Sequence, residues 1–179
     1  MDSVEIWNGA WDTTDEMAMN KWDALLQKGS RIPAIGSSDS HMPPTGKGGS
    51  PIGSPVTFVG TANLTQAAIL SAIRKGHVFV SEKPDQLISI TFGKTGIGDE
   101  IRTKKAEKLK LLVTTQNYPE GSILKLISDG KTLRESPIGK NHSEAVEFDV
   151  QKSTYLRAEV RDGKNKMLAF TDPIFIVTK

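Results

Sequence analysis

The feature that most constrains the fold is a change of pattern near residue 84. Before it, short strand-like segments alternate with helix-like segments, and after it the apolar segments have the length and alternation of strands. Alternating strands and helices are typical of βα units on a parallel sheet, whereas a run of short strands is typical of a sandwich. We therefore predict an α/β domain over residues 1–84 and an all-β domain over residues 85–179.

Two helices are predicted in the first part. One begins near Thr14 or Asp15, either of which can cap a helix N-terminus, and ends at Gly29. The other covers residues 64–75 behind a capping box formed by Asn63 and Gln66. With short connections between them, these helices would pack on a parallel sheet, whose strands are expected at residues 4–8, 32–35, 56–59 and 77–81.

The second part has the pattern of an immunoglobulin-like antiparallel β-sandwich, which places about seven strands in about 100 residues. Asp129 and Gly130 form a dipeptide that favours a tight hairpin turn. The strands are predicted at residues 87–92, 109–115, 123–128, 131–134, 145–150, 155–161, 167–170 and 174–177.

Composition excludes several classes of protein. The chain has no cysteine, which rules out disulfides and thiolate zinc sites but leaves the compartment open. A net charge of +2 with dispersed basic residues gives little support for nucleic-acid binding. No apolar run reaches the about 20 residues of a spanning helix, so we expect a soluble protein without membrane insertion.

The strongest chemical signal is Asp39 and His41, two positions apart after the apolar segment 32–35. Residues i and i+2 of a strand project to one face, so the carboxylate and the imidazole can converge beyond the strand end. Such a pair suits a divalent cation that activates water for hydrolysis, such as Zn²⁺, Mn²⁺ or Fe²⁺. The alternative is a turn in which Asp39 caps backbone amides and His41 lies in solvent.

Four stretches in order resemble the carboxyl-terminal part of a PHP (polymerase and histidinol phosphatase) metallohydrolase of the CehA/McbA-like branch. The end of the chain, at residues 155–159 and 169–174, is similar to the β domain appended in that branch. The four stretches are residues 5–9, residues 22–34, Gly36-Ser37-Ser38-Asp39-Ser40-His41 and residues 68–80.

The resemblance implies an irregular βα barrel with a metal cluster that hydrolyses small phosphoesters or other esters. Asp39 and His41 match the family's final Asp-x-His ligand motif, the aspartate for one metal and the histidine for another. The family's amino-terminal His-x-His is absent from this sequence, so we expect a piece of a longer enzyme that holds metal weakly by itself. Glu5, Asn8, Ser38 and Ser40 are expected beside the substrate or behind the metal ligands.

Two other functions stay open. The sandwich could itself be a binding module for a carbohydrate or protein partner, without catalysis, or it could be a structural cap that orders the Gly- and Pro-rich loop at residues 42–55 over the barrel. His77 and His142 are expected to be structural or surface residues. Because part of a barrel leaves unpaired strands, we also expect an exposed edge near residues 4–7 that favours self-association.

Overall fold

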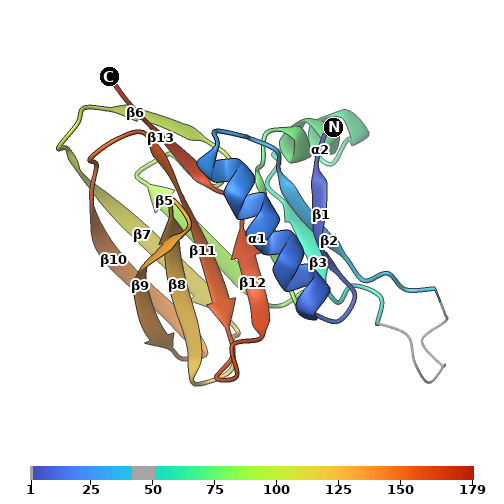
Figure 1. Cartoon of the computed structure of the whole chain (residues 1–179). Helices are drawn as coiled ribbons and strands as arrows, with labels where there is room; N and C mark the ends of the chain where they lie inside the picture. Colours follow the sequence, from blue (N-terminus) through green and yellow to red (C-terminus); the bar gives the residue numbers. More distant parts are fainter. Residues whose placement is uncertain (1, 42–50) are drawn as a thin grey trace.

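The structure is a computed structural model that describes residues 2–41 and 51–179. The chain is mostly β, with two helices (Figure 1). In chain order the elements are β1 (Val4–Asn8), α1 (Thr13–Gln27), β2 (Ala34–Ser37), β3 (Val56–Val59), α2 (Gln66–Arg74), β4 (Val78–Ser81), β5 (Leu87–Phe92), β6 (Glu100–Thr103), β7 (Lys108–Gln116), β8 (Ser122–Ser128), β9 (Lys131–Ile138), β10 (Asn141–Asp149), β11 (Thr154–Arg161), β12 (Met167–Thr171) and β13 (Ile174–Thr178).

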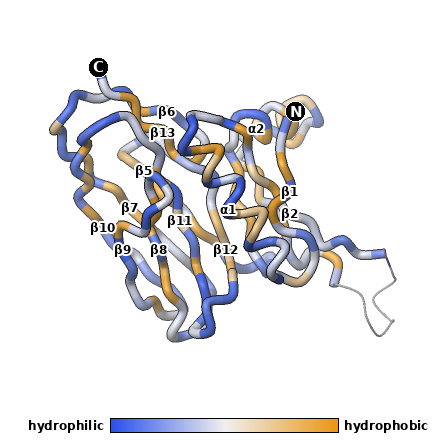
Figure 2. Tube along the Cα trace, viewed as in Figure 1, coloured by the Kyte–Doolittle hydropathy of each residue, from blue (hydrophilic) through white to orange (hydrophobic). Residues whose placement is uncertain are grey.

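Two sheets pack face to face around a common apolar core. The larger sheet has the order β3-β4-β12-β11-β13-β6, with β8 also on β11 and β9 on β8, and the smaller sheet has the order β10-β7-β5. Alternate residues of β5 and β11 fill the space between them, among them Ile88, Ile90, Leu156 and Val160. The alternation of apolar and polar residues along these strands is visible in Figure 2. An antiparallel β-sandwich therefore forms in this part of the chain.

The sandwich strands follow the sequence pattern closely. Asp129 and Gly130 both have positive φ, 49° and 70°, and join β8 to β9 as the predicted hairpin turn. Strand β6 was not predicted, because it has only one strongly apolar residue, Ile101, and pairs in parallel with β13. The sandwich part thus contains one strand more than the sequence indicated.

The predicted parallel sheet is wrong for half of its strands. β1 and β2 are parallel, but β3 and β4 are antiparallel. The Gly60 N–H donates to the His77 carbonyl at 2.8 Å, directly beyond the last pair of β3 and β4. Helix α2 is therefore an excursion from the end of a hairpin, not a crossover between parallel strands. The order strand, helix, strand is the same in both cases, so sequence periodicity could not separate them.

Both helix starts were misplaced by one to three residues. Asp12 is the N-cap of α1, and its carboxylate and that of Asp15 complete a capping box. Thr65 is the N-cap of α2 and accepts a hydrogen bond from the Ala68 N–H at 3.2 Å. Near the start of each helix, several residues have side chains that can act as the N-cap. The residue that does so, Asp12 or Thr65, has an extended backbone. The predicted end of α1 at Gly29 is confirmed, with Gly29 at φ 85° just beyond the helix.

The predicted boundary near residue 84 is crossed by backbone pairing. β4 lies before it and pairs antiparallel with β12, through residues 79–81 and 169–171. The two parts therefore share one sheet, and the division into two domains stays a prediction. The loop predicted at residues 42–55 lies largely outside the described residues.

Helix α1 covers the outer face of the larger sheet, over β11 and β12 (Figure 1). Its buried side chains Met19, Trp22 and Leu26 join Trp7 of β1 and Phe170 of β12 in a second apolar cluster. The rings of Trp22 and Phe170 lie 6.0 Å apart. This cluster attaches α1 and the β1–β2 pair to the sandwich.

Charged residues of β11 are buried under the same helix. Arg157, Glu159 and Arg161 are only 3%, 3% and 4% exposed. The Arg157 guanidinium donates to Asp23 of α1 at 2.8 and 2.9 Å and to Glu159 at 2.6 Å. Arg161 donates to Glu159 at 2.7 Å and to Glu16 of α1 at 2.9 Å.

The ion pairs of this network stabilise the charged forms of side chains that burial alone would favour in their neutral forms. Burial raises the pKa of Glu159, but the charges of Arg157 and Arg161 outweigh it and hold this pKa below its usual value. Burial lowers the pKa of Arg157, and Glu159 and Asp23 reverse that effect. All three β11 side chains are therefore ionised inside the protein.

We predict that Arg157→Ala lowers the free energy of unfolding by about 3–5 kcal/mol, because it removes the ion-pair partner of the buried Asp23 and one of the two arginine partners of Glu159. Urea unfolding would measure this loss. The matched control is Arg74→Ala, whose side chain is 55% exposed and contacts Asp2, 69% exposed, at the surface, with an expected loss of about 0–1 kcal/mol. Equal losses for the two variants would contradict a stabilising role for the network.

Asp172 is a second buried carboxyl group, 1% exposed, just beyond β12. Its Oδ1 accepts a hydrogen bond from the Ala34 N–H at 2.9 Å, which ties β2 to the sandwich. Its Oδ2 has no hydrogen-bond partner among the described residues. Burial raises the pKa of Asp172 well above its usual value, although the Ala34 N–H and Arg157 act in the opposite direction.

This raised pKa predicts a pH-dependent stability. The folded state holds the Asp172 proton more tightly than the unfolded state, so stability is lost as pH rises above the unfolded pKa of about 3.9. Asp172→Asn keeps an oxygen for Ala34 and does not titrate. Its free energy of unfolding relative to the native protein should therefore increase from pH 4 to pH 8 in urea unfolding. Asp85→Asn, at an exposed position, is the control, and a difference independent of pH would contradict the assignment.

Candidate functional site

Asp39 and His41 lie just beyond the end of β2, at the carboxyl end of the parallel β1–β2 pair. Strand β2 reaches this position by packing closely on β4 at Gly36, where a Cβ atom would lie 2.7 Å from Val80. The Thr57 hydroxyl of β3 donates to the Gly36 carbonyl at 2.7 Å and accepts from its N–H at 2.9 Å. The segment that leads into the motif is thus held firmly against the larger sheet.

The two predicted ligands contact each other. His41 Nε2 lies 2.9 Å from Asp39 Oδ1, and the side chains are 82% and 48% exposed. Asp39 has φ 46°, a backbone conformation that aspartate tolerates better than most residues. The two side chains therefore contact each other on the surface of the described structure, beyond the strand and not on one of its faces, and their role as metal ligands stays a prediction.

Two of the other predicted residues form a neighbouring polar group. The Glu5 carboxylate accepts hydrogen bonds from the Ser37 hydroxyl at 2.5 Å and from the Asn8 side chain at 3.3 Å. Ser38 and Ser40, which lie between Ser37 and His41 in the chain, are half-buried. Glu5 and Asn8 thus lie at the same end of the β1–β2 pair as Asp39, and their roles stay a prediction.

Three ligating side chains do not come together anywhere in residues 2–41 and 51–179. Asp39 and His41 alone supply one oxygen and one nitrogen, whereas a catalytic zinc site has three protein ligands. The described part of the chain therefore does not fit a complete hydrolytic metal centre.

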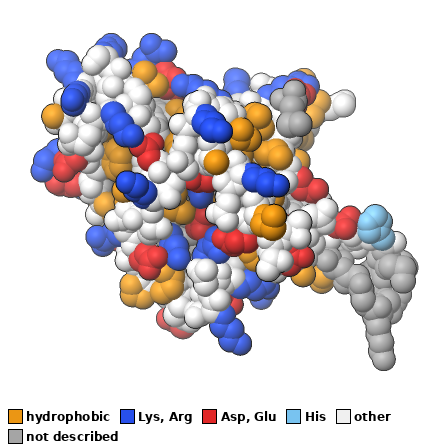
Figure 3. Space-filling view, viewed as in Figure 1, with side chains coloured by type: hydrophobic (Ala, Val, Ile, Leu, Met, Phe, Trp, Pro, Cys, Tyr) orange, Lys and Arg blue, Asp and Glu red, His pale blue; other side chains and the backbone are white. Residues whose placement is uncertain are grey.

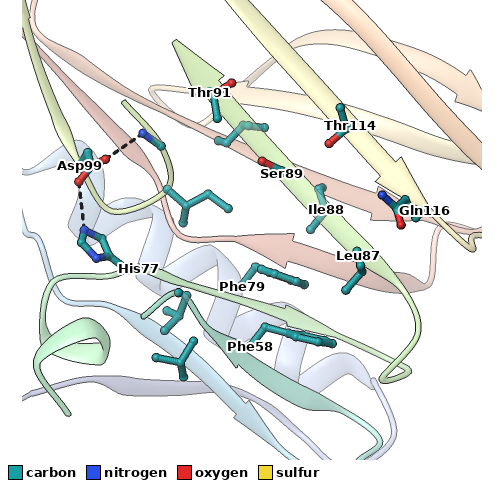
Figure 4. Close-up of a pocket in the computed structure, with 16 residues that line it drawn as sticks. Phe58, His77, Phe79, Leu87, Ile88, Ser89, Thr91, Asp99, Thr114 and Gln116 are labelled. Carbon is teal, nitrogen blue, oxygen red and sulfur yellow. Dashed lines mark hydrogen bonds and ion pairs between the residues drawn. The ribbon is translucent and has the colours of Figure 1, made fainter. Parts of the chain in front are cut away.

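A cavity of about 520 Å³ lies between β4 and β5, where the two sheets diverge. Phe58 of β3 and Phe79 of β4 form one wall, with their rings stacked at 4.5 Å and 8°. Leu87 and Ile88 of β5 lie opposite, as Figure 4 shows. The wall continues around β5 onto the outer face of the smaller sheet, through Ser89, Thr91, Thr114 and Gln116.

His77 and Asp99 contact each other at one end of this cavity. His77 Nε2 lies 3.0 Å from Asp99 Oδ1, and Asp99 Oδ2 accepts a hydrogen bond from the Gly96 N–H at 2.9 Å (Figure 4). His77 was expected to be structural, and its contact with Asp99 joins the end of α2 to the loop before β6. Both oxygens of the carboxylate are engaged, and Asp99 is the one acidic residue among the described residues that line the cavity.

The sequence did not single out the cavity. Phe58 and Phe79 belong to predicted strands, but the cross-strand pairing that stacks them follows from the antiparallel register of β3 and β4. The signal that could have found it is one aromatic residue in each of two adjacent short strands, Phe58 and Phe79.

A scan against protein-family models and a search of curated proteins find no match to this chain. Among solved structures, the chain is similar to a CARDB domain from Pyrococcus furiosus determined by NMR. The sequences are 12% identical, the TM-score is 0.34, and the alignment covers 53% of this chain and 96% of that domain. This likeness is too distant to assign a function or a family.

Neither helix in the described ranges is long and apolar enough to cross a membrane. Basic and acidic side chains are interspersed over the face of the molecule in Figure 3. This distribution agrees with the near-neutral net charge of the sequence.

We predict that Asp39 and His41 bind zinc only weakly in this chain, because two exposed side chains do not fix an ion in advance. In an NMR titration with zinc chloride, the His41 imidazole signals should shift only at zinc concentrations well above that of the protein. Asp39→Ala should weaken this response further, while His77 and His142 serve as internal references. Stoichiometric binding at His41 would contradict the prediction.

Proposed function

We propose that this chain is a binding module whose ligand occupies the cavity between β4 and β5. The carrying observation is the cavity itself, which combines a stacked aromatic wall with a few polar groups. Ligand sites are typically concave, about 300–1,000 Å³ in volume, mostly apolar, and equipped with a small number of polar groups for orientation. The volume and lining of this cavity fall within that description.

Its position supports the same proposal. The cavity walls come from β3, β4, β5 and β7, which belong to the two different sheets, so the ligand would lie at the junction of the sandwich layers. Rigid strands on both sides would hold the walls in place. No catalytic group is needed for this function. We also propose that the sandwich is of the immunoglobulin-like kind.

The second candidate is the metal-dependent hydrolase suggested by the resemblance to PHP enzymes. One observation favours it, namely that Asp39 and His41 converge at 2.9 Å at the carboxyl end of two parallel strands. In that function they would contribute a carboxylate oxygen and an imidazole nitrogen to Zn²⁺, Mn²⁺ or Fe²⁺, and other ligands would come from outside the described residues. This second candidate function, and not the first, implies a phosphoester substrate and a PHP-type βα barrel.

We predict that the cavity takes up the apolar dye 1-anilinonaphthalene-8-sulfonate in a saturable way. Val59→Trp should weaken dye binding about tenfold, because Val59 lines the cavity and the larger side chain fills it. Fluorescence titration of the full chain would measure the affinity.

Leu133→Trp is the matched control, since Leu133 is 52% exposed on β9 and does not line the cavity. It should leave dye binding unchanged. Circular dichroism of both variants would verify that they are folded. If the native chain fails to bind the dye, or if both variants bind it equally well, the cavity is not the binding site.

A further inference from the structure

The backbone of β5 presents hydrogen-bonding groups to the cavity. In an antiparallel pair, the N–H and C=O groups of alternate residues point toward the partner strand and away from it. Phe92 N–H donates to the Thr95 carbonyl at 2.9 Å, and the Thr95 N–H donates to the Phe92 carbonyl at 3.1 Å. The N–H and C=O groups of Phe92 therefore point away from β7, and so do those of Ile90 and Ile88.

The hydrogen bonds between β7 and β10 indicate the same orientation of the β5 backbone. Val150 N–H donates to the Glu107 carbonyl at 3.0 Å, which continues the ladder between β10 and β7. Odd-numbered residues of β7 are thus bonded to β10, and even-numbered residues to β5. The even residues Thr114 and Gln116 face Ser89 and Leu87, which leaves Ile88 on the free side of β5.

These free groups are enclosed. Ile88 and Ile90 line the cavity but are only 3% and 0% exposed, so another strand reaches their backbone groups only when this edge of β5 opens toward the cavity. β7 is the strand that pairs with β5. Within the described ranges, no hydrogen bond joins their amides or carbonyls to another part of the chain. Buried backbone groups without partners are unfavourable, and a strand edge that carries them is a template for another strand.

The rest of the cavity fits such a strand. An added strand lies about 4.8 Å from its neighbour and sends alternate side chains to opposite faces. On one side these would meet Phe79 and Phe58, and on the other Ser89 and Thr91 (Figure 4). The described lining contains no lysine or arginine and carries the Asp99 carboxylate, so an acidic segment is unfavourable there. The stacked rings of Phe58 and Phe79 favour an uncharged, apolar segment.

We infer that the ligand is an extended, uncharged peptide segment that adds as a strand to the edge of β5 and places an aromatic or branched apolar side chain against Phe79. The inference rests on the proposed binding function and specifies its ligand. Main-chain hydrogen bonds to Ile88 and Ile90 would supply affinity, and the aromatic wall would select the side chain.

The test selects linear nonapeptides from a phage-displayed library on the full chain and then methylates each backbone nitrogen of the best peptide in turn. Methylation removes an N–H donor and keeps the side chain. We expect an affinity loss of about tenfold at every second position, where the N–H faces β5, and little loss between them. Fluorescence anisotropy would measure each peptide on the unaltered protein.

Phe58→Leu should weaken the peptide severalfold by removing one ring of the stack, and Leu133→Ala should not. An affinity pattern without alternation would overturn the inference, as would failure to select any peptide. In either case the dye titration decides the proposed function separately. Dye binding that depends on Val59 would keep the cavity as a ligand site and exclude a strand as its occupant.

Discussion

The buried charges of β11 fix how α1 lies on the sandwich. This strand is buried on both sides, with apolar residues toward the sandwich core and Arg157, Glu159 and Arg161 toward α1. A sheet face with three charges needs either water or ionic partners, and α1 provides the partners through Asp23 and Glu16. The helix in turn buries Trp7 and Trp22, which attach β1 and β2. The position of the Asp39 segment is thus linked, through α1 and the apolar cluster that α1 shares with β1 and β2, to an ionic contact far from it in sequence.

Strand β4 separates the two candidate sites. Val80 faces β2 and limits residue 36 to glycine, on the side that leads to Asp39 and His41. Its neighbour Phe79 faces the opposite way and forms the aromatic wall of the cavity. Because successive side chains of a strand point to opposite faces, one four-residue strand positions both sites. The two proposed functions therefore concern separate surfaces and can be tested independently.

Local features could be predicted from the sequence, and long-range pairing could not. Alternation located most of the sandwich strands, and the Asp129–Gly130 dipeptide located the turn between β8 and β9. The direction of β3 against β4 and the pairing of β4 with β12 leave no periodic signal. Alternating charges at 157, 159 and 161 would ordinarily indicate a solvent-facing side, and only the acidic residues of α1 explain their burial. The cavity follows from those pairings, so it was equally hidden.

Helix α2 packs loosely on the larger sheet. The hydrogen bond from Gly60 to His77 closes the hairpin beneath it, and among its own side chains Ala72 is the buried one. Such a segment contributes few contacts to the core and can open without separating β3 from β4. The stacking of Phe58 and Phe79 follows from the pairing of β3 with β4, so a change in the length of this connection would leave the two rings in place.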